Sequence, residues 1–477
     1  MADIKKIKPS LPKGTRDFLP AEVAKRNYIF DTIKSVFRKY GFQQIDTPAF
    51  ERLETLTGKY GEEGDRLLFK ILNSGDYLKD TPDADLQSKN SGAITKHIAE
   101  KGLRYDLTVP LARYVVQHNG ELTFPFRRFH IGPVWRADRP QKGRYQEFYQ
   151  CDADVIGSTS LLNEVELTQM YVEVFKKLGI EVVIAINHRK VLQGIAAYLG
   201  IFEIEQIETF CTVIDKLDKI GKEKVVEELE SLFPITPRLE SFKNVLNRFY
   251  EIADKAYYNW EESIYALQNV LKKNENFNWE KWVESNLYLS NILTRIEFNN
   301  QIKVIPFLAR GLSYYTGAIW EVVLDKSHEP NQAITMGSLG GGGRYDNLTE
   351  MFGGRDMSGV GISFGIERIY DVMEELKLFP AELGETTKVL FVHFDEASEA
   401  YAFEALQKVR AADIASEIYP GKKKLDKQMN YANDKKIPYV IVIGENERES
   451  HQLTFKNMKS GEQQKLSIEE IIEKLQA

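Results

Sequence analysis

Near its start the chain carries a helical pattern followed by a strand pattern. Apolar residues recur at helical spacing through residues 21–40, and the pattern stops at Gly41, which favours a helix that ends on a glycine. Residues 43–47 are expected to follow as a strand that ends at Pro48. Because proline has no backbone N–H to donate, this strand is expected at the edge of a sheet or at an interface.

Two runs rich in aromatic and β-branched residues, 128–135 and 145–156, flank turn-forming residues at 138–143. This pattern predicts a long antiparallel hairpin. An amphipathic helix is expected next at 160–178, and a buried strand at 181–186.

The pattern of residue types changes between residue 188 and about residue 297. This stretch is charged and poor in glycine, and it shows helical periodicity in KEKVVEELESLF and FKNVLNRFYEIADKAYYNW. It is expected to be a helical insertion. Strand patterns return at 303–308 and 319–324, followed by a glycine-rich turn and a helix near 365–375.

A new unit begins after Glu385, where short apolar strands alternate with helical stretches. This alternation is typical of a small α/β domain with a parallel sheet. The strands are expected at 389–394, 416–419 and 439–444, and the helices at 397–412 and 425–436.

Composition narrows the class of protein. The chain has 477 residues, of which 43% are hydrophobic and 28% are charged, with both signs mixed. Two or three soluble globular domains are therefore expected. No apolar run is long enough to cross a bilayer, and the N-terminal residues lack the apolar core of a secretory signal, so a cytoplasmic location is expected. Cys151 and Cys211 form no CxxC pair, which implies neither a disulfide framework nor a structural zinc.

The formal net charge is −7, yet the hairpin region is strongly basic. Between residues 127 and 144, six cationic side chains accompany the single acid Asp138. The cations are Arg127, Arg128, Arg136, Arg139, Lys142 and Arg144. An anionic ligand is expected there, and the alternative is a solvated cationic loop on an ordinary sheet.

Four distant segments place an arginine or an acid beside small or aromatic residues at the end of an expected strand. They are RYDLTVP at 104–110, the block at 126–157, RGLSYYTG at 310–317 and GVGISFGIER at 359–368. Sites are commonly built this way, from polar groups held by rigid strands. Taken alone, the last segment can equally well be interpreted as a strand and a glycine turn followed by a helix start with Arg368 on the surface.

The glycine run at 340–343 does not match a nucleotide-binding fingerprint. It lacks the lysine and hydroxyl of a phosphate loop, and it has no GxGxxG spacing. Glycines still allow a backbone to approach a flat ligand closely, whereas the alternative is a flexible turn.

Taken together, these segments resemble the class II histidyl-tRNA synthetases over nearly the whole chain. The resemblance lies in KGTRDFLP, in IDTPAFE with Pro48 (motif 1), in the block at 126–157 (motif 2), in RGLSYYTG and GSLGGGGRYDNL (two histidine-specific boxes) and in GVGISFGIERI (motif 3). It implies an α+β fold in which an antiparallel-sheet catalytic domain, 1–187 and 303–385, is interrupted by a helical insertion, 188–302. An α/β anticodon-binding domain, 386–477, would follow, and two copies would form a homodimer through the Pro48 region.

The resemblance also implies a reaction and its ATP-binding residues. L-histidine and ATP would form histidyl adenylate and pyrophosphate, and the histidyl group would pass to the 3′-terminal adenosine of tRNA(His). The α-phosphate would be held by Arg136 and Arg310, and the adenine and outer phosphates would lie by Arg368. Phe148 would stack on the adenine. Mg²⁺ is inferred from the ATP chemistry, with no protein ligand assigned.

For histidine and tRNA the resemblance implies further residues. Asp106, Leu107, Thr108 and Gln150 would surround the amino and carboxylate groups, with Arg310 near the carboxylate, and Asp154, Tyr314 and Tyr315 would lie at the imidazole ring. Arg139, Gln141, Lys142 and Arg144 would meet the tRNA acceptor end. The family usually has Asp where this chain has Ser313, and bacterial relatives commonly have Glu at the positions of Asp106 and Asp154. The loss of that Asp leaves the charge balance near Ser313 open.

Two alternatives from other classes remain. One is a catalytically inactive histidine sensor, such as the regulatory subunit of ATP phosphoribosyltransferase. Such relatives generally lack the C-terminal domain and degrade RGLSYYTG and the motif arginines, both of which this chain retains. The other is a class II synthetase for a different amino acid, against which the histidine-specific boxes argue.

Overall fold

The structure is a computed structural model with two compact units. One unit comprises Met1–Phe18 and Lys25–Phe379, and the other comprises Leu19–Ala24 and Pro380–Ala477. The described residues are 8–58, 61–233, 242–244, 246–247, 288, 291–292, 295, 301–309, 315–346, 349–354, 357–381, 383–384, 387–421 and 423–476.

A large mixed sheet organises the first unit. Among the described residues, eight strands form it in the order β1-β5-β6-β11-β10-β9-β7-β8. The pairs β1–β5 and β7–β8 are parallel and the inner pairs are antiparallel. The strands are β1 (Gln43–Gln44), β5 (Phe126–Trp135), β6 (Glu147–Ile156), β7 (Val182–His188), β8 (Ile302–Val304), β9 (Ala318–Leu324), β10 (Gly340–Tyr345) and β11 (Gly359–Gly365).

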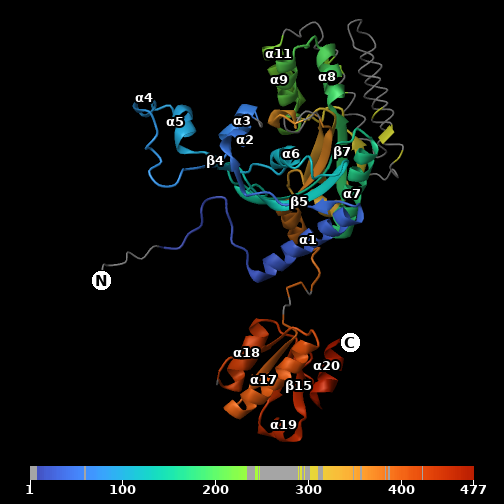
Figure 1. Ribbon diagram of the computed structural model, residues 1–477. Coiled ribbons are helices and arrows are strands. Elements are labelled where there is room, and N and C mark those ends of the chain that lie inside the picture. The colour runs from blue at the N-terminus through green and yellow to red at the C-terminus, as the bar shows by residue number, and fades with distance from the viewer. Residues whose placement is uncertain are drawn as a thin grey trace. The chain divides into compact units, whose positions relative to one another are not determined.

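Helices cover this sheet, and α1 and α6 lie on either side of β5 in Figure 1. The predicted helices at 21–40 and 160–178 are confirmed as α1 and α7, and a left-handed Gly179 caps α7. The helices are α1 (Pro20–Lys39), α2 (Leu53–Leu56), α3 (Gly61–Arg66), α4 (Asp83–Ser88), α5 (Ser91–Ile98), α6 (Thr108–Gln117), α7 (Leu162–Leu178), α8 (Arg189–Tyr198), α9 (Ile204–Ile214), α10 (Leu217–Ile220), α11 (Lys222–Leu232), α15 (Glu329–Gln332), the 3₁₀ turn η1 (Glu350–Phe352) and α16 (Ile366–Glu375). In the described part of the chain, no helix has the length and apolar character needed to cross a membrane.

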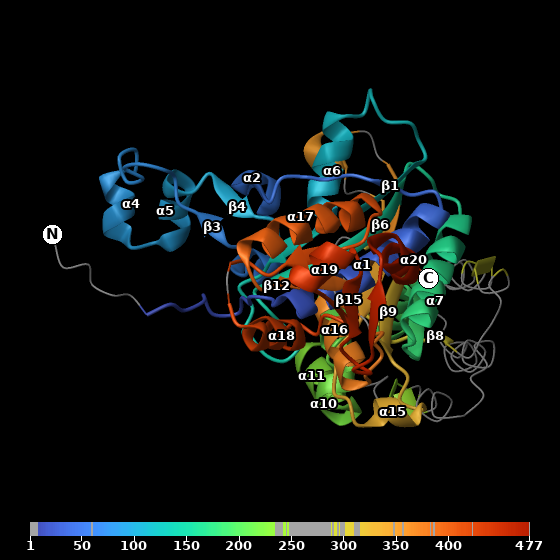
Figure 2. The same ribbon diagram turned by 90° about the horizontal axis from the view of Figure 1, so that it is seen from below.

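A smaller sheet of β2 (Phe50–Arg52), β4 (Lys101–Leu103) and β3 (Lys70–Ile71) precedes the hairpin. The chain between β3 and β4 carries α4 and α5, which were not predicted. These two helices lie side by side and away from the large sheet in both views (Figures 1 and 2). Neither helix has a buried residue, and Leu86 of α4 is 36% exposed, so no apolar face in the sequence indicated them.

The two faces of the large sheet differ in chemistry because side chains alternate along each strand. One face is apolar and packs on α1, α7 and α16. Phe364 of β11 is fully buried there, with its ring 4.8 Å from that of Tyr171 and 5.9 Å from that of Phe37. Burying such a side chain stabilises the fold by about 1.5–3 kcal/mol. The opposite face, which we call the polar face, carries Gln150, Asp152 and Asp154.

The glycine run was expected as a turn, and this expectation was wrong. Residues Gly340–Tyr345 form β10, an inner strand that pairs with β9 on one side and β11 on the other. Its glycines leave room for rings on both faces: a Cβ on Gly340 would lie 2.8 Å from the Tyr171 ring, and a Cβ on Gly343 would lie 2.5 Å from the Tyr315 ring. The run is a strand because close packing, and not chain reversal, requires its glycines.

Part of the predicted helical insertion is described. Its first stretch forms α8 to α11, and KEKVVEELESLF is confirmed as helical in α11. Most of residues 234–300, including FKNVLNRFYEIADKAYYNW beyond its first residues, lies outside the described residues. The four-part division of the chain into domains stays a prediction.

The second unit has a five-stranded sheet in the order β13-β12-β14-β15-β16. Its three predicted strands are confirmed and are parallel, but β15 and β16 form an antiparallel hairpin, so the fully parallel sheet was wrong. The edge strand β16 is too polar to stand out in the sequence, and β15 buries only Leu453 and Phe455 between polar residues. The elements are β12 (Val389–His393), α17 (Glu396–Ala411), β13 (Ser416–Ile418), α18 (Leu425–Asp434), β14 (Tyr439–Ile443), α19 (Glu445–Ser450), β15 (Leu453–Asn457), β16 (Gln463–Leu466) and α20 (Ile468–Gln476).

Gly342→Ala should destabilise the first unit by at least about 1–3 kcal/mol, because the added Cβ would overlap the backbone carbonyl of Gly361 on β11. All five tryptophans lie within Lys25–Phe379, so urea unfolding followed by tryptophan fluorescence reports this unit. Gly120→Ala is the control, since its Cβ would meet nothing within 4 Å. Equal unfolding midpoints for the two variants would contradict this explanation of the glycine strand.

Candidate active site

The predicted hairpin is confirmed, and its register sets which side chains face one another. Strands β5 and β6 pair from Phe126 with Ile156 to Trp135 with Glu147. Within this register Arg128 lies opposite Asp154, and His130 lies opposite Asp152. These cross-strand pairs share the polar face.

A buried ion pair lies at the centre of the polar face. An Nη of Arg128 is 2.7 Å from an Asp154 oxygen, and Arg128 is fully buried while Asp154 is 3% exposed. The angle of this contact falls outside hydrogen-bond geometry, so it is a close ion pair. Arg128 also donates to the Leu107 carbonyl at 3.3 Å, and the Tyr345 hydroxyl donates to the other Asp154 oxygen at 2.5 Å. The pair thereby joins β5, β6 and β10 to the segment before α6.

Three buried carboxylates share this neighbourhood: Asp106, Asp152 and Asp154. Burial raises the pKa of Asp154, and the charge of Arg128 only partly opposes this. Burial also raises the pKa of Asp152 to about 7. The positive charge of Arg128 opposes this rise, and the negative charge of Asp154 adds to it. Burial disfavours the charged form of both carboxyls, so a cationic group placed beside them would stabilise that form.

Asp106 and Thr108 lie where α6 begins. An Asp106 oxygen accepts a hydrogen bond from the Val109 N–H at 3.1 Å, which satisfies one of the free donors at the start of this helix. Thr108 is the first residue of α6 and is partly exposed. The RYDLTVP segment is thus held as a helix start beside the hairpin.

Gln150 and Asp154 extend over neighbouring strand β11. The Gln150 amide donates to the Ser363 hydroxyl at 3.2 Å, and its buried carbonyl oxygen has no hydrogen-bond partner among the described residues. A Cβ on Gly361 would overlap the Asp154 carboxylate, so this carboxylate lies flat on the glycine backbone. Tyr315 lies in the same way over Gly343 of β10. The glycine strands therefore form the floor of the candidate site.

Arg136 and Phe148 come together at the open end of the hairpin. The Arg136 guanidinium donates to the Tyr105 carbonyl at 3.1 Å and lies 4.2 Å from the centroid of the Tyr105 ring. The same guanidinium is 5.2 Å from the centroid of the Phe148 ring. A cation and a flat ring are thus presented side by side.

The hairpin loop is folded, and its polar side chains other than Asp138 are exposed. Gln141 and Arg144 exchange backbone hydrogen bonds of 3.0 and 2.9 Å around a left-handed Gly143. Arg144 pairs with Asp138 at 2.7 Å, and Lys142 pairs with Glu375 of α16. Arg139 and Gln141 are exposed beside them.

Arg368 lies against this loop. Its guanidinium donates to the Gly143 carbonyl at 2.9 Å and to the Ser338 carbonyl at 2.7 Å. The preceding residue, Glu367, is buried, and it pairs with Arg26 at 2.6 Å and with Arg16 of the KGTRDFLP segment. The start of α16 is thereby tied to the hairpin loop and to the N-terminal segment.

His130 is buried on the polar face but is not part of an ion pair. Its Nε2 lies 2.9 Å from an oxygen of Asp46, although neither ring nitrogen has hydrogen-bond geometry with a described partner. Burial, together with the charges of Arg128 and Arg104, lowers the pKa of His130 to about 3. The imidazole is therefore neutral near pH 7, and its contact with Asp46 is not an ion pair.

Two of the candidate residues cannot be placed. Arg310 and Tyr314, together with Ser313, lie outside the described residues. The sequence did not assign Arg128, Tyr345 and Ser363 to the site, although they contact Asp154 or Gln150. It also did not assign Asp152, which lies between these two on β6, or Glu367, which precedes Arg368. Alternation along β6 could have indicated the face of Asp152, but the other contacts depend on the register between distant strands.

The second unit presents an exposed ring at the carboxyl end of its parallel strands. The chain leaves β12 for β13 on one side and then crosses to β14 on the other, so β12 and β14 flank a topological switch point. Ligands of α/β sheets bind outside the carboxyl ends of strands at such points. Phe394 follows β12 directly and is 50% exposed, and a Cβ on Gly444, which follows β14, would lie 3.1 Å from its ring.

Comparisons with known proteins agree over nearly the whole chain. Residues 14–83 and 99–369 match a family described as Histidyl-tRNA synthetase, and residues 386–477 match one described as Anticodon binding domain. A histidine–tRNA ligase of Bacteroides fragilis (strain YCH46) is 51% identical over 474 residues, 98% of each chain. One of Flavobacterium johnsoniae is 46% identical over 97% of this chain and 98% of its own. The crystal structure of histidyl-tRNA synthetase from Nostoc sp. PCC 7120 has a TM-score of 0.77 at 28% identity and covers 99% of both chains.

Asp152→Asn should change the pH dependence of stability. The folded chain holds the Asp152 proton up to a pKa of about 7, whereas the unfolded chain releases it near the ordinary value of 3.8. The wild type should therefore lose stability relative to the variant as the pH rises from about 4 through 7, because folding then requires proton uptake or a buried charge.

The difference between the two urea midpoints should be smallest at pH 5 and largest at pH 8. Asp80→Asn, at an exposed aspartate, is the matched control and should leave the pH profile unchanged. A constant offset between the wild type and Asp152→Asn at all pH values would contradict the assignment.

Proposed function

The chain belongs to the histidyl-tRNA synthetase family, and we propose that it is a histidine–tRNA ligase that uses ATP to join L-histidine to tRNA(His). The observation that carries this conclusion is the 51% identity to a named histidine–tRNA ligase over 98% of both chains. An inactive histidine sensor is not favoured, because such relatives generally lack a C-terminal domain and this chain matches an anticodon-binding family over residues 386–477.

For histidine binding, we propose that Asp154 accepts a hydrogen bond from the imidazole ring. Supporting this role, the Asp154 carboxylate is buried and oriented by Arg128 and Tyr345. A carboxylate has about four lone-pair sites, so these two contacts leave capacity for a ring N–H. A site built around such a hydrogen bond can reject amino acids that lack it by roughly 10⁴ to 10⁵. Tyr315, and Tyr314 outside the described residues, are proposed to flank the ring.

The amino and carboxylate groups of histidine are assigned to the neighbouring residues. Asp106, Thr108 and Gln150 are proposed to surround them, with Leu107 contributing backbone. The raised pKa values of the acids on this face favour the arrival of a cationic ammonium. Arg310 is proposed to hold the carboxylate, and it lies outside the described residues.

For the first step, a histidine carboxylate oxygen attacks the α-phosphorus of ATP. The bond from this phosphorus to the oxygen that bridges to the β-phosphate breaks, and pyrophosphate leaves. We propose that Arg136 and Arg310 stabilise the charge that moves across the α-phosphate, and that Phe148 stacks on the adenine. The closeness of Arg136 to the Phe148 ring supports this pairing. Loss of such an arginine should cost roughly 3–4 kcal/mol in the transition state.

Arg368 is proposed to bind the outer phosphates. Two of its five N–H donors bind the carbonyls of Gly143 and Ser338, which holds the guanidinium beside the hairpin loop. A charge-assisted hydrogen bond to phosphate is stronger than one to a neutral carbonyl, so an outer phosphate can compete for this guanidinium.

Magnesium is proposed to arrive with ATP. Within the described ranges, no group of three or more His, Cys, Asp or Glu side chains is placed to hold a metal ion. Mg²⁺ usually keeps several waters and binds substrate phosphates with one or two carboxylates. The described residues therefore fit a metal carried by the ATP phosphates.

For the second step, a hydroxyl of the terminal adenosine attacks the histidyl carbonyl carbon, and AMP leaves. We propose that Arg139, Gln141, Lys142 and Arg144 contact the acceptor end, because all four are exposed on one folded loop. Such contacts to phosphates position the tRNA and carry no sequence information. The second unit is proposed to read the anticodon, with Phe394 as a stacking surface for a base.

Assembly, domain division and location remain part of the proposal. A homodimer is proposed through the Pro48 region, where β1 is an edge strand of the large sheet and Phe50 is 49% exposed. The domains are proposed as 1–187 with 303–385, 188–302 and 386–477. A cytoplasmic location is proposed as well.

The purified protein should exchange pyrophosphate into ATP in the presence of histidine and magnesium. Asp154→Asn should raise KM for histidine by at least about a hundredfold, with KM for ATP nearly unchanged, because it removes the charge that the ring is proposed to meet. Both constants come from the same exchange assay. Exchange that does not require histidine would overturn the assignment, and an unchanged KM for histidine would show that another residue binds the ring.

Phe394→Ala should weaken tRNA charging without affecting the first step. Loss of a base–aromatic stack costs about 1–3 kcal/mol, so KM for tRNA should rise roughly tenfold or more, while pyrophosphate exchange stays the same. Phe403→Ala is a matched control, because Phe403 is 51% exposed in the same unit on α17. Equal KM values for tRNA in the two variants would remove Phe394 from the tRNA surface.

A further inference from the structure

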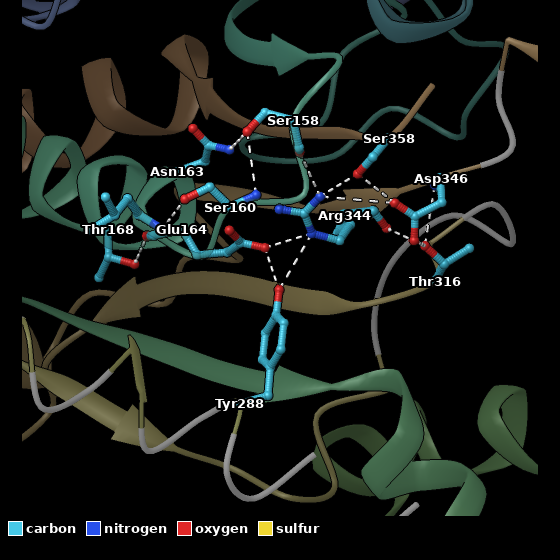
Figure 3. A network of polar contacts seen from close by, with 11 residues as sticks. Ser158, Ser160, Asn163, Glu164, Thr168, Tyr288, Thr316, Arg344, Asp346 and Ser358 are labelled. Carbon is cyan, nitrogen blue, oxygen red and sulfur yellow. Dashed lines mark hydrogen bonds and ion pairs between the residues drawn. The ribbon is translucent and has the colours of Figure 1, made fainter. Parts of the chain in front are cut away.

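Arg344 lies in GSLGGGGRYDNL between two residues of the candidate site but points to the other face of the sheet. It is 5% exposed, and its guanidinium lies at the centre of the polar network in Figure 3. Its Nε donates to Glu164 at 2.6 Å and to the Tyr288 hydroxyl at 3.3 Å. Its Nη1 donates to the Ser158 carbonyl at 3.1 Å and to the Ser358 hydroxyl.

These contacts bring together four segments that are far apart in the sequence. Glu164 belongs to α7, Ser158 follows β6, Ser358 precedes β11, and Tyr288 belongs to the insertion. The Tyr288 hydroxyl also donates to Glu164, and its ring lies 4.5 Å from that of His188, where β7 ends. Tyr288 is thus the described residue through which the distal part of the insertion contacts this network.

The charges make the network rigid. Burial alone would lower the pKa of Arg344, but the hydrogen bond and the charge of Glu164 outweigh this, so its pKa is raised and it stays cationic. Burial, reinforced by Glu164, raises the pKa of Tyr288, so its hydroxyl keeps the proton that it donates. Glu164 is fully buried and is oriented by both donors. Removing either donor leaves a buried carboxylate with a weaker set of partners.

The same strand positions the candidate site on its other face. Gly343 lies under the Tyr315 ring, and Tyr345 donates to Asp154. The Arg344 carbonyl accepts from the Thr316 N–H at 2.8 Å, which fixes the chain directly after Tyr315. Asp346 adds to this, because it accepts from the hydroxyls of Thr316 and Ser358 at 2.6 Å each. A shift of Arg344 therefore moves both tyrosines.

We propose that Tyr288, Glu164 and Arg344 form a positioning network through which the insertion sets where Tyr315 and Tyr345 hold the histidine side chain. This inference rests on the proposed function, since it assigns the network to the histidine site. No member of the network touches substrate. Its effect passes through β10, so it acts on amino-acid binding and leaves the ATP contacts of Arg136 and Phe148 unchanged.

Tyr288→Phe tests this most directly, because it removes one hydroxyl and leaves the ring. KM for histidine in pyrophosphate exchange should rise roughly three- to thirtyfold, the usual range for residues that act on a site through others. KM for ATP and kcat should stay within about twofold of the wild type, since a purely uniform loss of binding appears in KM alone. A general loss of folding would instead lower the apparent kcat, because it reduces the active fraction, and would leave both KM values unchanged.

Lys216→Met is the matched control within the insertion. It breaks the 2.5 Å pair of Lys216 with Glu228 and touches no member of the network, so KM for histidine should not change. If Lys216→Met raises KM for histidine as much as Tyr288→Phe does, the effect is general to the insertion and the network proposal is overturned.

Arg344→Lys supplies a second, independent measurement. Lysine keeps the charge but cannot reach the same set of partners, so KM for histidine should rise, and the double variant with Tyr288→Phe should be no worse than Arg344→Lys alone. Additive effects would show two separate sites and overturn the network. If Arg344→Lys does not fold, as judged by circular dichroism, Tyr288→Phe carries the test.

Different results would overturn the proposed function and the positioning network. A wild-type protein without histidine-dependent exchange would overturn the proposed function. A wild type with normal exchange, beside a Tyr288→Phe variant whose KM for histidine is unchanged or whose KM for ATP rises equally, would overturn the positioning network alone.

Discussion

The ion pair between Arg128 and Asp154 is the interaction on which the candidate site depends. Both groups are almost completely removed from water. Breaking such a pair by removing one partner costs about 3–5 kcal/mol, because the remaining charge stays buried. The pair is satisfied only when β5 and β6 hold their register, the Leu107 carbonyl reaches Arg128 and Tyr345 reaches Asp154. One electrostatic requirement thus fixes four segments of the chain.

The glycines of β10 and β11 follow from the same requirement. The Asp154 carboxylate lies over Gly361 and the Tyr315 ring lies over Gly343, and a side chain at either position would displace them. The opposite face of these strands carries Phe364 against Tyr171 and Phe37, which anchors the floor to a rigid core. Buried carboxyls are therefore held on a rigid scaffold, which suits the recognition of an amino acid through its ammonium group and its imidazole N–H.

Catalysis and tRNA reading are divided between elements with different physical demands. The first unit holds its site through buried pairs: Arg26 and Arg16 on Glu367 tie the N-terminal segment to α16, and Arg344 on Glu164 ties β10 to α7. The surfaces proposed for tRNA are exposed instead, on the hairpin loop and at Phe394. Exposed contacts cost little stability and can be made and broken in each cycle.

The sequence by itself determined the strong local patterns. It indicated the hairpin, helices α1, α7 and α11 and the three parallel strands of the second unit, because their periodicity and end residues are local signals. It also indicated the family, through motifs such as RGLSYYTG and GVGISFGIER. Strand alternation, which is set by the backbone, also places Gln150, Asp152 and Asp154 on one face.

Only the tertiary structure determines which side chains contact one another in the site. Nothing local shows that Arg128 meets Asp154, that Tyr345 reaches the same carboxylate, or that Arg344 turns away to Glu164, because these contacts depend on strand order and register across the whole sheet. For the same reason the glycine run was expected as a turn but is an inner strand. Its glycines are required by the close approach of aromatic rings and of backbone from distant segments. Local sequence preferences determine which helices and strands form, and long-range burial of charged groups determines how these elements pack against one another.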